Sequence, residues 1–80
     1  MIFEDDKARL AVGKKQVIKV LSGEGASKLY IAEDCDDDIR KKVESVINIG
    51  AQVFYIPTMK ELGRMCSIDV GASCAAVKKY

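Results

Sequence analysis

Hydrophobic and polar positions follow two kinds of pattern along the 80-residue chain. Short, nearly continuous apolar runs, which are typical of strands in a covered sheet, occupy residues 10–12, 29–32, 53–56 and 72–77. The segments between them carry apolar residues at helical spacing. In the second of these segments, Ile39, Val43, Val46 and Ile47 recur at i, i+4, i+7 and i+8, which predicts a helix with one buried face.

Glycines, acids and a capping pattern mark the expected helix ends. Gly13 precedes a helix that should stop at residues 22–25, where two glycines occur. Acids at 36–38 favour the start of the next helix, and Gly50 is expected to end it. Residues 58–61 form a capping-box pattern that predicts a third helix, burying Leu62 and Met65. Asp5 or Asp6 could cap a further short helix, which would run to about Leu10.

The alternation of helices and strands predicts an α/β domain with helices on both faces of a mixed central sheet of about four strands. A chain of this length supports one hydrophobic core, so residues 1–80 are expected to form a single domain. With 49% hydrophobic residues, this core should need neither a disulfide nor a metal ion.

The charge is small in sum but segregated along the chain. The net charge is +1, which argues against a generally adhesive polycation. Acids gather at residues 4–6 and 33–38, whereas bases gather at residues 7–19 and 40–42. No acid occurs from Lys7 to Ser22. Any affinity for a polyanion should therefore come from a local site of limited extent.

Residues 13–19 form the first candidate site. A helix start presents free backbone N–H groups and a partial positive charge, and Lys14, Lys15 and Lys19 would add cations beside it. Gln16 adds an amide that can both donate and accept, as reading of a base edge requires. The pattern therefore indicates RNA or another polyanion. A solvated helix face of surface lysines is the alternative reading of the same residues.

Catalysis and metal binding find little support in the residues. The chain has no His, and its three cysteines lack Cys-x-x-Cys spacing, so no metal site and no cofactor are expected. Cys66 and Cys74 lie in apolar context and are expected to be small core residues. Cys35 lies between Asp34 and Asp36, which would disfavour its thiolate. No apolar stretch is long enough to span a membrane, and we expect a cytoplasmic monomer.

Residues 62–72 form the second distinctive stretch. Ile68 and Val70 should lie in a loop beside Gly71, between the third helix and the last strand. Simple core packing is one interpretation of these apolar residues. The alternative is an exposed apolar surface on which a base or ribose can rest, and it predicts partial exposure of both side chains.

The basic helix start at residues 13–19 and the loop at residues 62–72, in this order, resemble the ribosomal protein L7Ae/L30e family. The similarity extends from about Lys7 to Val77, and the closest resemblance is to small bacterial ribosomal-protein-like members. It implies a three-layer α/β/α sandwich that binds kink-turn RNA. In this family the helix start enters the RNA beside tandem sheared G·A pairs, and the apolar loop packs near an extruded nucleotide.

The resemblance assigns roles residue by residue. Lys15 and Gln16 stand where archaeal members have Asn and Glu, and Lys19 matches the family lysine. Ile68 and Val70 match the apolar loop. Asp36 falls where some members use an acid near the flipped base, although a helix N-cap is the competing interpretation. The chain departs from the family at residue 59, where Met replaces a basic residue found in many members.

Three hypotheses about function follow. The first is a non-enzymatic RNA-binding protein that recognises a kink-turn, with a possible place on the ribosome or at a riboswitch. The second is a protein-interaction or ribosome-assembly module that uses the same fold, with Ile68 and Val70 as its partner patch. The third is an enzyme, which the absence of any acid–base constellation disfavours.

Overall fold

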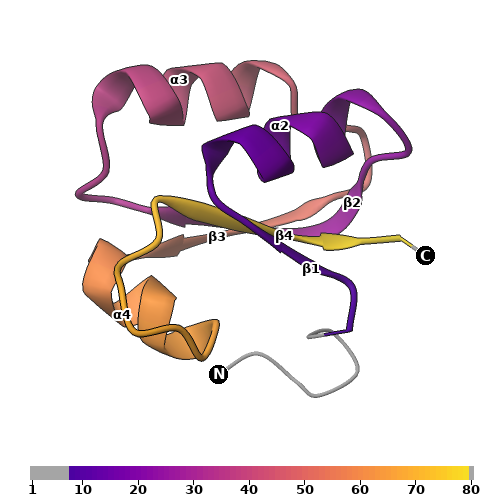
Figure 1. The fold of residues 1–80 in the computed structure, drawn as a ribbon. Coiled ribbons are helices and arrows are strands. Elements are labelled where there is room, and N and C mark those ends of the chain that lie inside the picture. The colour runs from indigo at the N-terminus through magenta and orange to yellow at the C-terminus, as the bar shows by residue number, and fades with distance from the viewer. Residues whose placement is uncertain (1–7, 80) are drawn as a thin grey trace.

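The structure, a computed structural model, describes residues 8–79, and its elements alternate between strands and helices. In chain order they are β1 (Leu10–Val12), α2 (Lys14–Ser22), β2 (Ala26–Ala32), α3 (Asp37–Ser45), β3 (Gln52–Ile56), α4 (Met59–Met65) and β4 (Cys74–Lys78). The strands form one mixed sheet in the order β1-β4-β2-β3, with β2 and β3 parallel and β4 antiparallel to both of its neighbours. Helices α2 and α3 cover one face and α4 the other (Figure 1). The three-layer prediction is confirmed.

The core lies on both sides of the two central strands. Leu29, Ile31 and Ala32 of β2 are fully buried, as are the residues from Cys74 to Val77 in β4. Val17 of α2 and Val43 of α3 close the core on one face, and Leu62 of α4 closes it on the other. The prediction that residues 29–32 form a strand covered on both faces is therefore confirmed.

Residues 53–56 form a strand, as predicted, but the prediction that this strand is buried is wrong. β3 is an edge strand, and Phe54 and Tyr55 are 42% and 47% exposed. Phe54 stacks on Tyr30 with a centroid separation of 5.2 Å, and the Tyr55 hydroxyl donates to Glu44. The apolar run therefore reflects ring stacking and partial cover at the edge of the sheet, not enclosure on both faces.

Three element boundaries also differ from expectation. Helix α3 ends at Ser45, because the chain then turns to place Asn48 beside β2, where its side-chain amide accepts from the Ala26 N–H and donates to the Ala26 carbonyl. β4 begins at Cys74, two residues later than expected. The short first helix would begin outside the described residues, and its expected end is wrong because Leu10 lies in β1.

Backbone hydrogen bonds gather three loops at one edge of the sheet. The N–H of Gly13, after β1, donates to the Cys74 carbonyl at 2.9 Å, and the N–H of Ala32 donates to the Ser73 carbonyl at 2.9 Å. The carboxyl ends of β1 and β2 thus lie beside the amino end of β4. We call this the loop edge, and its three parts are residues 13–16, residues 33–36 and residues 67–73.

Candidate nucleic-acid interface

Helix α2 begins at the loop edge with its first turn open. Gly13 has φ +95°, a conformation that favours glycine, and its carbonyl accepts from the Val17 N–H at 2.9 Å. No side chain caps this start, and no acid lies in its first turn. Lys14, Lys15 and Gln16 are exposed. The predicted glycine turn is confirmed, and the first N–H groups of α2 lie among cations without an acidic partner in the first turn.

The helix is amphipathic. Val17 and Leu21 are buried against the sheet, whereas Lys15, Gln16 and Lys19 are exposed. The exposed residues nevertheless occupy two flanks of the helix. Lys15 lines a groove toward α3, Gln16 lines a smaller hollow on the other side, and Lys19 borders both. The structure therefore keeps the three side chains on one surface but separates Lys15 from Gln16.

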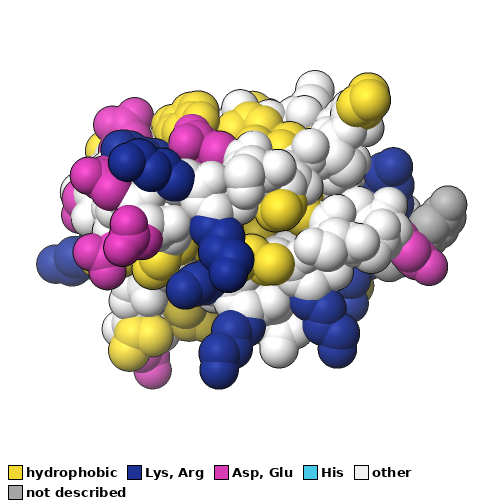
Figure 2. Space-filling view, turned by 90° about the horizontal axis from the view of Figure 1, so that it is seen from above, with side chains coloured by type: hydrophobic (Ala, Val, Ile, Leu, Met, Phe, Trp, Pro, Cys, Tyr) yellow, Lys and Arg dark blue, Asp and Glu magenta, His cyan; other side chains and the backbone are white. Residues whose placement is uncertain are grey.

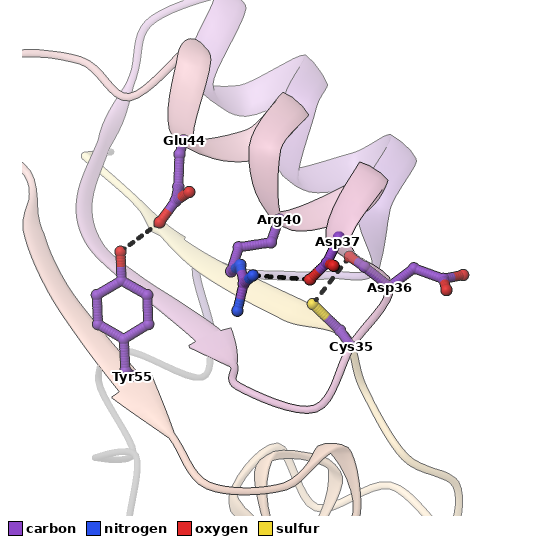
Figure 3. Close-up of polar contacts among 6 residues, drawn as sticks. All are labelled: Cys35, Asp36, Asp37, Arg40, Glu44 and Tyr55. Carbon is purple, nitrogen blue, oxygen red and sulfur yellow. Dashed lines mark hydrogen bonds and ion pairs between the residues drawn. The ribbon is translucent and has the colours of Figure 1, made fainter.

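Asp36 stands at the N-cap position of α3, as the alternative interpretation predicted, but its side chain makes no capping hydrogen bond. Its backbone carbonyl accepts from the Arg40 N–H at 3.0 Å and from the Cys35 thiol at 3.6 Å. The carboxylate itself is exposed and points away from Cys35, Asp37 and Arg40 (Figure 3). Asp36 therefore presents an acceptor at the loop edge that no side chain or backbone group among residues 8–79 engages.

The cysteines are buried, which agrees with the expectation for Cys66 and Cys74 and extends it to Cys35. Burial raises the pKa of all three thiols, and the carboxylates of Asp34 and Asp36 raise that of Cys35 further against the opposing effect of Arg40. The prediction of a disfavoured Cys35 thiolate is thus confirmed. Within residues 8–79 no group of His, Cys, Asp or Glu side chains is arranged to hold a metal ion.

Residues 67–73, the apolar loop, are fixed through their backbone. The Ile68 N–H donates to the Gly63 carbonyl at 3.1 Å, and the Ala72 N–H donates to the Met59 carbonyl at 3.0 Å. Because these bonds hold the loop on α4, the apolar side chains need not be buried. Ile68 is 36% exposed and Val70 is 70% exposed. The predicted exposure is confirmed, and simple core packing is wrong.

Three contributions were not predicted from the sequence. Met59 is 36% exposed and lies against Gly71, so it extends the apolar surface of the loop. Asp34 accepts from the Met59 N–H at 2.7 Å, which ties residues 33–36 to the start of α4. Lys42 of α3 shares the groove of Lys15 and Lys19. The position of Met59 directly after the Thr58 cap could have indicated its exposure, because the first turn of a helix is often open to solvent. The contributions of Asp34 and Lys42 depend on tertiary packing and could not be seen in the sequence.

The structure brings most of the predicted residues to the loop edge. Those at this edge are Gly13, Lys14, Lys15, Gln16, Asp36, Ile68, Val70 and Gly71. Lys19 lies one helical turn further along α2. No helix within residues 8–79 has the length and apolar character needed to cross a membrane.

The chain matches the Ribosomal protein L7Ae/L30e/S12e/Gadd45 family over residues 4–80. It belongs to this family. The family resemblance seen in the sequence is thereby confirmed, and so is the prediction of a non-enzymatic protein.

Several bacterial relatives are similar over most of their length. RNA-binding protein TTE2299 of Caldanaerobacter subterraneus subsp. tengcongensis is 47% identical over 66 residues, which cover 81% of this chain and 80% of the relative. RNA-binding protein BH0128 of Halalkalibacterium halodurans is 38% identical over 71 residues, with 88% and 87% covered. RNA-binding protein YbxF of Geobacillus stearothermophilus is 36% identical over 70 residues, with 86% and 85% covered.

Proposed function

We propose that this family member is an RNA-binding protein that recognises a kink-turn through the loop edge. Family membership and the names of its relatives support RNA binding. One observation carries the finer proposal: the open start of α2, with its lysines and Gln16, shares an edge of the sheet with an exposed apolar loop. A bent RNA with extruded bases offers phosphates, base edges and base faces close together.

The α2 start supplies the polar contacts in this proposal. Lys14 and Lys19 neutralise phosphates, which contributes affinity without sequence information. Lys15 donates to a guanine edge or to a phosphate, and Gln16 reads a G·A base edge through its paired donor and acceptor. The free N–H groups at the first turn add to the attraction for a phosphate.

The apolar loop and Asp36 supply the remaining contacts. Ile68 and Val70 pack against an extruded nucleotide, and the exposed Met59 side chain widens that surface. Gly71 lets the loop backbone lie close to Met59. The exposed Asp36 carboxylate accepts a hydrogen bond from the extruded base. Because a carboxylate has no donor, the base must supply an N–H group for this contact.

In this role the protein acts in the cytoplasm as a monomer, and its ligand is ribosomal RNA or a riboswitch. A protein-interaction module remains the rival function, because Ile68 and Val70 would serve a protein partner equally well as exposed apolar residues. The two functions differ in what Gln16 should do, since a base-reading amide has no necessary role in a contact with a protein.

Fluorescence anisotropy with two RNAs tests the proposal. One RNA carries a kink-turn with tandem sheared G·A pairs, and the other has these pairs replaced by Watson–Crick pairs in an otherwise identical sequence. The expected preference for the kink-turn is on the order of 10³-fold, the lower end of the range for specific binding of nucleic acid. Equal dissociation constants for the two RNAs would contradict kink-turn recognition and leave only unspecific RNA binding.

A further inference from the structure

A groove between α2 and α3 leads away from the loop edge. It has a volume of about 510 Å³, and it is lined by Lys14, Lys15, Ile18, Lys19, Ser22 and Lys42. Its lining extends from the first residue of α2 to the last. At 1.5 Å per residue this is a length of about 12 Å, which corresponds to roughly three nucleotides of one strand.

The groove is strongly cationic. Four of the six lining residues are lysines, and none of the described residues that line it is acidic. Among residues 8–79 these four lysines make no ion pair, whereas Arg40, two positions before Lys42, is paired with Asp37 at 2.7 Å. In the view onto this face, Lys and Arg side chains cross the middle of the surface and acids gather toward one end (Figure 2). The free protein therefore holds four neighbouring like charges that only an anion would neutralise.

The hollow on the other flank of α2 differs in both size and charge. It has a volume of about 270 Å³, and its lining combines Lys19 and Lys78 with the carboxylate of Glu24. A polyanion would meet repulsion from Glu24 in this hollow. Of the two depressions beside α2, the one toward α3 is thus the one whose charge suits a row of phosphates.

We infer that the α2–α3 groove holds the phosphate backbone of the RNA stem that extends beyond the kink. This inference rests on the proposed function, because it takes the RNA to be seated at the loop edge. Lys14 and Lys15 belong to both the loop edge and the groove, so a strand bound at the edge can pass into the groove without a gap in positive charge. Lys42 contributes the opposite wall from α3 and acts as a phosphate ligand, which reads no sequence.

The test compares Lys42→Ala with Lys41→Ala. Both lysines are exposed, lie on the same helix and change the net charge equally, but Lys41 does not line the groove. Each variant is titrated with a kink-turn whose stem is trimmed at the kink and with one whose stem is extended by ten base pairs. We expect Lys42→Ala to weaken binding of the extended RNA by roughly three- to tenfold and to reduce its log–log salt slope by about 1. Binding of the trimmed RNA should be unchanged, and Lys41→Ala should match the unmodified protein on both.

Two results would overturn the inference. One is equal affinity and equal salt slope for Lys42→Ala and Lys41→Ala on the extended RNA. The other is that Lys42→Ala abolishes binding of a polyglutamate peptide but leaves the extended RNA unaffected, which would assign the groove to an acidic protein. Failure of the proposed function would be seen separately, as loss of the preference for a kink-turn over its Watson–Crick counterpart in the unmodified protein.

Discussion

Gly63 in α4 lies against the backbone carbonyl of Val70, so that a β-carbon at residue 63 would overlap the carbonyl oxygen. This close approach, together with the hydrogen bond from the Ile68 N–H to the Gly63 carbonyl, fixes the apolar loop on the helix. The loop can thereby present apolar side chains to solvent while its backbone stays in place.

The first prediction concerns this contact. Gly63→Ala should force the loop away from α4, and we expect it to lower the free energy of unfolding by about 1–3 kcal/mol, as overpacking does. It should also weaken kink-turn binding, because Ile68 and Val70 lose their position. Arg64→Lys is the control, since Arg64 is the next residue of α4 and its side chain is exposed. Urea unfolding and RNA titration of both variants measure the effect, and equal behaviour of the two would show that the Gly63 contact is unimportant.

The second prediction separates binding from stability at the loop. Ile68→Ala and Val70→Ala should each weaken kink-turn binding by about 1–3 kcal/mol, the range for loss of a base contact. The free energy of unfolding should fall much less in these two variants than in Leu62→Ala, where loss of a core side chain should cost about 2–5 kcal/mol. Ile49→Ala is the control for an exposed residue, since its side chain is 99% exposed. Loss of stability without loss of affinity in the folded protein would reject the nucleotide contact.

The third prediction concerns which residues of α2 contribute specificity and which contribute affinity. Gln16→Ala should cost about 1–3 kcal/mol on a kink-turn and little on unstructured RNA, because it removes a reader of base edges. Lys14→Ala should instead weaken binding to both RNAs by a similar factor, as loss of a phosphate contact does. Equal losses for Gln16→Ala on the two RNAs would argue against a base-reading role.

Much of this arrangement could be predicted from local sequence. Gly13 and the residues after it form the turn and amphipathic helix that their pattern indicates, and Thr58 caps α4 by accepting from the Glu61 N–H. The exposure of Ile68 and Val70 was also predicted. These features depend on residues close in the chain, for which hydrogen-bonding and conformational preferences decide the outcome.

The features that escaped prediction depend on contacts between distant segments. The position of β3 at the sheet edge follows from strand order, which an apolar run does not specify. The early end of α3 follows from the pairing of Asn48 with Ala26, 22 residues away in the chain. Lys42 was visible as part of a basic cluster, but only the packing of α3 beside α2 shows that it faces Lys15 and Lys19.

The fourth prediction concerns pH. Burial raises the pKa of the Cys74 thiol above its usual value, so the folded state favours the protonated form. The stability contributed by the neutral thiol is therefore present below the unfolded-state pKa and is lost as the pH rises through the folded-state pKa. Chemical denaturation between pH 8 and pH 10.5 should show that the free energy of unfolding declines with pH. In Cys74→Ala the slope of this decline should be smaller, by up to about 1.4 kcal/mol per pH unit. Identical pH dependence in both proteins would contradict the shift.

The fifth prediction concerns ionic strength and thiol chemistry. The cationic groups near the loop edge are few, so kink-turn binding should show a log–log salt slope of about −2 to −5. Cys35→Ser should leave both this slope and the affinity unchanged, because Cys35 is buried. A slope near −10 would indicate a much larger contact with the RNA backbone, and a large effect of Cys35→Ser would assign the thiol a role in binding.

The loop edge as the RNA-binding surface is tested most directly by amide chemical-shift mapping. A ¹⁵N-labelled protein is titrated with kink-turn RNA, and shift changes are assigned along the chain. We predict that the largest changes fall at residues 13–19, 35–36 and 68–71, while the free edge at Gln52–Ile56 changes little. Changes centred on β3, with residues 13–16 and 68–71 unaffected, would contradict the account.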